Sequence, residues 1–438
     1  MQQQFEILGP RIRPPLGRWI PLSIQHVFAM FGATILVPIL TGLDPAAALF
    51  TAGTGTLIYI LLTGAKVPAF LGSSFAFISP IIAIAGGPGG PNMSYALGGA
   101  VAAGLFYCLV AAIIKFAGSA WLDRALPPVV IGSVIVVIGL NLAPTAMAMA
   151  MNVGGSAGGE YSLVLLSIAM VTLAVTVGAN IFLKGFFSVI PILIGLAAGY
   201  LFTLIMGIFF PAYHLINFDV VRAAPWFGLP RFRVPSFNLA ACLTFIIVSL
   251  ATICEHLGDT LVTSKVVGQD FYKNPGLHRT LSGDGLATAW AAFWGGPPNT
   301  TYGENIGVMA ITRVYSVWVI GGAAVIALLL SFFRKFGAII QTIPTPVLGG
   351  ISMLLFGIIA SSGLRTIVES GVDYKDKRNL TISSVIFVIG IGGGKLAFAI
   401  TQDLQFELAG VALATVVGII LNLVFPAKRA VVQSEKAK

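Results

Sequence analysis

Long apolar stretches follow one another along the whole chain, and this pattern restricts the possible fold more than any other feature. A helix that crosses a bilayer needs about 20 mostly apolar residues. Between charged residues and Pro/Gly clusters, the 438-residue sequence holds fourteen stretches of this kind. Only 9% of the residues are charged, against about 25% in soluble domains. The sequence therefore predicts an all-α polytopic membrane protein and excludes a soluble or a disordered chain.

The predicted spans form two groups of seven, separated by a polar, Pro-rich loop near 212–236. The third and tenth spans are weak because Ser, Thr, Pro, Asn and Glu interrupt them. Twelve spans with two surface helices remain an alternative. The predicted spans are 19–42, 45–63, 68–85, 95–117, 126–145, 161–183, 186–210, 238–263, 279–294, 299–313, 315–333, 337–361, 379–394 and 407–426.

The basic residues indicate an orientation. With the N-terminus in the cytoplasm, fourteen crossings leave 19 of the 25 Lys and Arg residues on the cytoplasmic side and six outside. This asymmetry is typical of membrane proteins. We therefore expect both termini in the cytoplasm. No basic run is longer than two residues, which argues against a nucleic-acid partner despite the net charge of +9.

Three short motifs recur in the same order in both halves, at offsets of 230, 227 and 218 residues. The predicted repeat is about seven spans long, and because seven is odd the two halves enter the membrane from opposite sides. Inverted repeats of this kind place the substrate site near the midplane, between broken helices. The paired motifs are Gln25-His26 with Glu255-His256, Ser73–Ala76 with Thr300–Gly303, and Pro128–Gly132 with Pro346–Gly350.

Ionisable residues inside the spans are the candidate site residues, because they are costly at membrane depth. Glu255 and Asp259 are four residues apart and share a helix face, whereas His256 points about 100° away. Glu304 lies in the tenth span. Other interpretations stay open: Glu255 as a buried acid paired with His256, Asp259 as a partly solvated residue near the cytoplasmic end, and Asp284 as a hydrogen bond between helices.

Two segments predict broken helices. The prolines and β-branched residues of Pro297–Glu304 favour a short extended stretch before a half-helix, and Leu71–Phe75 should behave alike. Half-helix N-termini would point N–H groups toward the midplane. With two carboxylates, Phe75 and Tyr302 nearby, the site fits a small planar ligand with ring N–H and carbonyl groups, such as uracil. No basic residue lies in Leu71–Phe77 or Pro297–Glu304, which disfavours an anion.

Other chemistries find little support in the sequence. The three cysteines lie in apolar stretches without CxxC spacing, and the four histidines are dispersed. Glu255–Asp259 resembles a metal-ligand spacing but contains a single imidazole, so we expect no metal and no cofactor. No hydrolase motif is present. A membrane-embedded enzyme, a channel and an anion transporter remain as rival classes, to be separated by experiment.

The string Glu304–Arg313 resembles the signature of the nucleobase–ascorbate transporter family: Glu or Gln, Asn, any residue, Gly, four of any, Thr, then often Arg. Gln25-His26 matches the first-span motif of that family. Leu71–Phe77 and Asn299–Glu304 are similar to its bacterial uracil-transporting members. The resemblance extends over nearly the whole chain.

This resemblance implies uracil–proton symport across a bacterial cytoplasmic membrane by a core domain that moves against a gate domain. The proton gradient would be the energy source, and two copies would pair through the gate domains. The implied parts are a cytoplasmic segment 1–18, core 19–118, gate 119–211, an external loop 212–236, core 237–335, gate 336–427 and a cytoplasmic tail 428–438.

The resemblance also assigns site residues. Glu304, where purine members often have Gln, favours a pyrimidine, and a xanthine- or urate-type purine permease is the alternative. Asp259 stands where close members have His, so its part in proton coupling is open, as is the choice of the proton-carrying carboxylate. The implied roles are side-chain binding by Glu255 and Glu304, backbone N–H binding by Phe75 and Gly303, pocket lining by Ala33, Tyr302 and Phe356 (a Tyr elsewhere), and hydrogen-bond support by His26.

Overall fold

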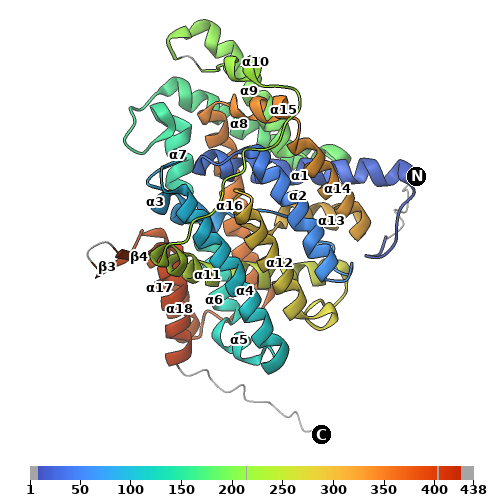
Figure 1. Ribbon diagram of the computed structural model, residues 1–438, viewed down its shortest axis with the longest axis vertical. Coiled ribbons are helices and arrows are strands. Elements are labelled where there is room, and N and C mark those ends of the chain that lie inside the picture. Colours follow the sequence, from blue (N-terminus) through green and yellow to red (C-terminus); the bar gives the residue numbers. More distant parts are fainter. Residues whose placement is uncertain (1–7, 214, 402–403, 426–438) are drawn as a thin grey trace.

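The computed structural model describes residues 8–213, 215–401 and 404–425, and this part of the chain is mostly helical (Figure 1). Helices or half-helices are present in all fourteen predicted spans. The elements of the first half are α1 (Leu16–Thr41), α2 (Pro45–Leu62), β1 (Leu71–Ser73), η1 (Phe75–Phe77), α3 (Ile78–Ala85), α4 (Met93–Ala117), α5 (Ala120–Ala125), α6 (Pro128–Asn141), α7 (Ala143–Met151), η2 (Val153–Gly155), α8 (Leu163–Phe182), η3 (Gly185–Val189), α9 (Pro191–Phe209), η4 (Pro211–Tyr213) and α10 (Asp219–Ala223).

The second half repeats the pattern of long helices with one broken segment, and adds a β-hairpin that the sequence did not predict. Its elements are α11 (Leu239–Val267), η5 (Tyr272–Gly276), α12 (Leu277–Phe293), β2 (Asn299–Thr301), α13 (Gly303–Thr312), α14 (Val317–Ser331), α15 (Arg334–Gln341), α16 (Thr345–Glu369), α17 (Lys377–Ile391), β3 (Lys395–Thr401), β4 (Leu404–Ala409) and α18 (Val411–Val424).

Several predicted span boundaries are shifted. The predicted span 126–145 runs past the end of α6 at Asn141 and into α7, which begins at Ala143. The predicted span 337–361 begins inside the short α15, and α16 starts only after Pro344, the extended residue that precedes its first turn. Proline is favoured at a helix start because it has no N–H to leave unpaired there. The predicted span 407–426 begins within β4, and its helix starts at Val411.

Eight of the described helices are long and apolar enough to cross a membrane. They correspond to α1, α2, α4, α6 with α7, α8, α9, α11 and α16. Shorter apolar helices, among them α14 and α18, accompany them. This pattern identifies a multi-pass membrane protein.

The helices pack as two sets. In one set α4, α12, α2 and α14 lie side by side with α1 and α11 against them (Figure 1). In the other set α16 packs on α6, α7 and α8, while α17 and α18 pack on each other and on α6. Glycines permit the closest approaches in both sets. An ideal Cβ at Gly104 would lie 2.5 Å from the carbonyl oxygen of Gly285, and one at Gly132 would lie 2.7 Å from that of Gly363.

The two broken segments meet through their strands, as the sequence predicted for extended stretches at these places. β1 and β2 pair antiparallel, with Gly72 opposite Thr300. Two further backbone bonds extend the pairing: the amide of Ser74 donates to the Pro298 carbonyl at 2.8 Å, and that of Tyr302 donates to the Phe70 carbonyl at 3.0 Å. Non-helical backbone at membrane depth must be satisfied within the protein. This pairing provides the partners and holds the two half-helix starts together.

Candidate functional site

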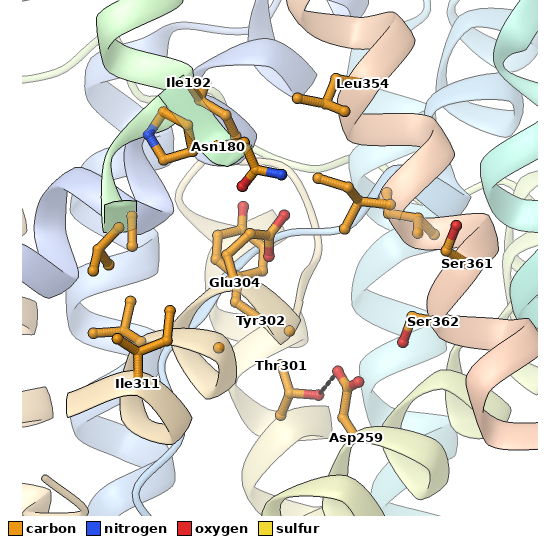
Figure 2. A pocket seen from close by; sticks show the side chains of 18 of the residues that line it. Asn180, Ile192, Asp259, Thr301, Tyr302, Glu304, Ile311, Leu354, Ser361 and Ser362 are labelled. Atoms are coloured by element: carbon orange, nitrogen blue, oxygen red, sulfur yellow. Dashed lines mark hydrogen bonds between the residues drawn. The ribbon is translucent and has the colours of Figure 1, made fainter. Parts of the chain in front are cut away.

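A cavity of about 420 Å³ lies beside the paired strands, between the two sets of helices (Figure 2). Its walls come from α1, η1, α6, α8, η3, α9, α11, β2, α13 and α16. The sequence-predicted residues among its lining are Phe75, Glu255, Asp259, Tyr302, Gly303 and Glu304. Residues separated by about 230 positions in the chain therefore meet at one place.

Two carboxylates face the cavity from α11, as their four-residue spacing predicts. Strand β2 holds both of them by hydrogen bonds. The hydroxyl of Thr301 donates to Asp259 Oδ2 at 2.8 Å, and that of Thr300 donates more weakly to Glu255 Oε2 at 3.4 Å. Both acids are half-buried. The site thus contains hydrogen-bond acceptors that are positioned by the strand and remain open to the cavity.

Glu304 adds a third carboxylate from the first turn of α13. A helix N-terminus carries free N–H groups and a partial positive charge, which favours an acid at this position. The preceding residue, Gly303, is exposed to the cavity, and an ideal Cβ built on it meets no atom within 4 Å. The backbone of the first turn is therefore accessible next to the Glu304 side chain (Figure 2).

Tyr302 is almost fully buried and links three elements through its hydroxyl. That hydroxyl accepts a hydrogen bond from Thr34 of α1 at 3.2 Å and donates one to the Ser73 carbonyl of β1 at 3.2 Å. On the opposite segment, the ring of Phe75 meets that of Phe356 edge to face, with 5.6 Å between centroids. Tyr302 and Phe75 give the cavity two aromatic surfaces of fixed orientation.

Three of the predicted residues lie outside the lining of this cavity. Ala33 is fully buried on α1, and Phe356 is buried behind Phe75. His26 is also buried, and its Nδ1 lies 3.0 Å from the side-chain nitrogen of Asn305, which donates to the His26 carbonyl as well. Because Asn305 follows Glu304, these contacts connect His26 to the first turn of α13 on the side away from the cavity.

His256 does not pair with Glu255, which overturns that interpretation of the sequence. Its Nδ1 instead lies 3.0 Å from Asp284 Oδ2, and both side chains are completely buried. The contact joins α11 to α12, in agreement with the interpretation of Asp284 as a link between helices. The helical spacing predicted that the His256 side chain points away from the Glu255 face, but no motif in the sequence indicated Asp284 as its partner.

Several polar lining residues escaped the sequence reasoning. Asn180 of α8, together with Ser361 and Ser362 of α16, reaches the cavity from the second set of helices (Figure 2). Arg365 of α16 also lines the cavity. Asn180 is the one amide in an otherwise largely apolar helix, and that signal was available in the sequence. The two serines carry no comparable signal, because Ser is common at helix–helix contacts in membranes.

Comparison with solved structures supports the fold. The chain is similar to the transmembrane domain of the cyanobacterial bicarbonate transporter BicA, with a TM-score of 0.64 and 16% identity over 95% of this chain and all of that one. It is also similar to SLC26A9, with a TM-score of 0.65 and 12% identity over 93% of this chain and 64% of that one. These likenesses show that the chain shares the fold of these membrane proteins, and the cavity lies between the two helix sets of that fold.

The sequence places the chain more narrowly. Residues 17–397 match the model described as the Permease family, and the chain belongs to this family. Proteins named uracil permease are 53% identical over 96% of this chain and 95% of the relative in Bacillus subtilis, and 47% identical over 95% and 94% in Escherichia coli K12. The resemblance seen in the signature at Glu304 is confirmed, and the chain is a transporter and not an enzyme.

Proposed function

We propose that this protein is a proton-coupled symporter that imports uracil across the cytoplasmic membrane of a bacterium. The observation that carries the proposal is the meeting of Glu255, Glu304 and the open backbone of Gly303 around one cavity. The names of the relatives in Bacillus subtilis and Escherichia coli support uracil as the substrate. They do not favour the purine alternative.

Recognition follows from complementary edges. The ring N–H groups of uracil would donate hydrogen bonds to the carboxylates of Glu255 and Glu304. Its carbonyl oxygens would accept hydrogen bonds from the backbone N–H groups of Gly303 and Phe75. The rings of Tyr302 and Phe75 cover the faces of the base. His26, Ala33 and Phe356 would support these residues from behind, since the cavity lining does not include them.

Proton coupling follows from the cost of charge at membrane depth. Glu255, Asp259 and Glu304 surround one cavity, so their negative charges repel one another. Protonation of one carboxyl group from outside reduces this repulsion and favours the arrangement that binds uracil. Loss of that proton to the cytoplasm weakens the fit and releases the base. Asp259 is a third candidate for the proton carrier because Thr301 keeps it close to the paired strands. The proton gradient would be the sole source of energy, with no cofactor.

The proposed architecture has fourteen crossings in two inverted halves, with both termini cytoplasmic. Residues 19–118 and 237–335 would form the core domain, and 119–211 and 336–427 the gate, through which two copies would pair. The separate packing of the two helix sets supports this division. Ile311 and Arg365 line the cavity near the predicted cytoplasmic loops, so we assign the described conformation an inward-facing opening.

The decisive experiment is uptake of radiolabelled uracil into proteoliposomes with and without an inward proton gradient. We expect accumulation that requires the gradient and disappears with a protonophore. Uracil flux that is unaffected by the protonophore would indicate a channel instead. Stronger inhibition by unlabelled xanthine than by unlabelled uracil would indicate a purine permease, and chemical conversion of uracil without a gradient would indicate an enzyme.

A further inference from the structure

An apolar groove of about 480 Å³ lies on the outer surface of the first helix set and is lined by residues of α1, α2 and α14. These three helices pack against one another, and their ribbons are shown in Figure 1. Leu57 and Ile60 of α2 and Gly321 of α14 form its floor and sides. Leu16 and Trp318 border it and are strongly exposed, at 60% and 47% of their surfaces. The groove therefore opens outward, toward the lipid, and away from the cavity described above.

A polar hollow of about 430 Å³ adjoins one end of this groove. Arg11, Lys66 and Asn274 are among its lining residues. The two surfaces are continuous in the chain, since Ala65 lines the groove and Lys66, the next residue, lines the hollow. An apolar trough thus ends in a basic recess.

Arg13 lies over two indole rings that line the groove. Its guanidinium lies 4.8 Å from the ring centroid of Trp19 and 5.6 Å from that of Trp318. The two indoles are held together, because Trp19 Nε1 donates to the Trp318 carbonyl at 2.6 Å. Tryptophans with a nearby basic residue are typical of the membrane–water interface. Arg13 therefore lies at the depth of lipid headgroups.

The positive charge of this end has no acidic counterpart among the described residues. Neither the groove nor the hollow has a carboxylate in its lining, and Arg11, Arg13 and Lys66 form no salt bridge within the described ranges. The neighbouring Asp270 is bound to Lys273 at 3.2 Å. Arg11 and Lys66 thus line the recess, Arg13 lies beside it on the indoles of the groove, and none of the three cations is paired with a carboxylate in the described ranges.

We propose that this combined surface binds one anionic phospholipid, with an acyl chain in the apolar groove and the phosphate in the basic recess. A headgroup of net negative charge is complementary to Arg11 and Lys66 of the recess and to Arg13 beside it, whereas a choline headgroup would bring a further positive charge next to them. In the proposed orientation the recess faces the cytoplasmic leaflet. The site does not depend on which substrate the transporter carries.

The bound lipid would hold a contact between distant segments. Leu8–Ile12 runs along the connection between α13 and α14: the amides of Tyr315 and Val317 donate to the carbonyls of Leu8 and Pro10, both at 2.8 Å. The hydroxyl of Ser316 donates to the Ile12 carbonyl at 2.6 Å. A phosphate bound by both Arg11 and Lys66 would connect Leu8–Ile12 to the residues that follow α2. Because Leu8–Ile12 also contacts the connection after α13, the bound lipid would stabilise the end of the helix that carries Glu304.

The test uses native mass spectrometry of the purified full chain in detergent, titrated with phosphatidylglycerol or phosphatidylcholine of identical acyl chains. We expect one tightly retained phosphatidylglycerol and at least about tenfold weaker retention of phosphatidylcholine. Equal retention of the two lipids by the unaltered protein overturns the proposal, whatever the variants do. Displacement of phosphatidylglycerol by soluble glycerol phosphate would also overturn it, because that result describes a free phosphate site.

Two sets of variants separate the parts of the site. Replacement of Arg11, Arg13 and Lys66 together by Gln should lower phosphatidylglycerol binding to the level of phosphatidylcholine. The matched control replaces three exposed basic residues elsewhere, Lys184, Lys375 and Lys377, by Gln, and should keep the preference. Equal loss in both triple variants would overturn the proposal, since general charge would then explain the binding.

The second variant fills the groove. At Gly321 an added Cβ meets only Ile60 Cδ1, at 3.7 Å, so Gly321→Leu should be accommodated while its side chain occupies the space of the acyl chain. We expect it to lose both lipids. Retention of phosphatidylglycerol in Gly321→Leu would place the lipid elsewhere and refute the assignment.

Discussion

The two broken segments have the same outline but differ in chemistry. The first runs through β1, η1 and α3, and the second through β2 and α13. Each begins with a three-residue strand, the strands pair with each other, and a short helix follows. Leu71–Ala85 contains no charged residue, whereas the second segment has Glu304 in the first helical turn. The second also holds two further acids through Thr300 and Thr301.

This difference separates two tasks at one site. The first segment supplies an apolar ring, Phe75, and a backbone carbonyl, Ser73, that orients Tyr302. The second supplies every charge that the pair of segments brings to the cavity. Structural pairing of the segments therefore does not make them equivalent. We expect changes in the second segment to alter recognition through charge, and side-chain changes in the first to act through packing and through the ring of Phe75.

The largest expected effect is that of Glu304→Gln. The substitution keeps the shape but replaces a charged acceptor, and a hydrogen bond to a charged group contributes about 1.5–3 kcal/mol, or roughly 10- to 100-fold in affinity. We expect uracil uptake to fall by that factor or more, with relative preference moving toward a purine. The measurement is the initial rate of labelled uracil uptake, with xanthine as competitor. The control Glu160→Gln lies in an exposed loop and should transport normally. Unchanged uracil uptake by the Glu304→Gln variant would refute the assignment of this site.

A matched pair of glycines probes the comparison directly. An ideal Cβ at Gly72 would lie 2.4 Å from Cζ of Tyr302, whereas one at Gly303 meets nothing within 4 Å. Overpacking of a buried site costs about 1–3 kcal/mol. We expect Gly72→Ala to lower the thermal unfolding temperature, and Gly303→Ala to leave it unchanged while raising the KM for uracil. If the two variants have the same thermal unfolding temperature, the proposed division of tasks between the segments is wrong.

The broken segments were predictable because their cause is local. Pro297, Pro298 and the β-branched residues after them disfavour a helix, and the same pattern recurs weakly at Leu71. The shared face of Glu255 and Asp259 followed from helical periodicity alone. These features depend on a few neighbouring residues, and the structure has them where the sequence predicted.

Features that depend on distant partners were not predictable in the same way. The contact between His256 and Asp284 joins two helices whose relative rotation no short motif encodes. Asn180 reaches the cavity only because α8 packs beside α16. The β3–β4 hairpin lies mostly in the connection between the predicted spans 379–394 and 407–426, where the sequence indicated no strand pairing. In each case tertiary packing decides between local alternatives.

Tyr302→Phe should have a smaller effect than either change above. It removes the hydroxyl that connects Thr34 with the Ser73 carbonyl, and leaves both buried groups without this partner. A hydrogen bond of this kind contributes about 1 kcal/mol, which corresponds to roughly fivefold. We expect a modest loss of thermal stability and a rise in KM of about that size, with the ring still covering the base. The matched change Tyr315→Phe, in the connection before α14, serves as the control. A larger effect on uptake than that of Glu304→Gln would show that orientation of the ring outweighs the charge.

The smallest expected effects come from the two strand threonines, and their order tests which acid the strand holds. Thr301 donates to Asp259 at 2.8 Å, whereas Thr300 donates to Glu255 at 3.4 Å, beyond the usual range of a strong bond. Thr301→Val should therefore slow uracil uptake by about two- to fivefold, and Thr300→Val by less than about twofold. Both variants keep β-branching, so strand pairing should survive. Initial uptake rates at saturating uracil separate the two. The reverse order would mean that the strand positions Glu255 more firmly than Asp259, and would move the proton-coupling role toward the substrate-binding acid itself.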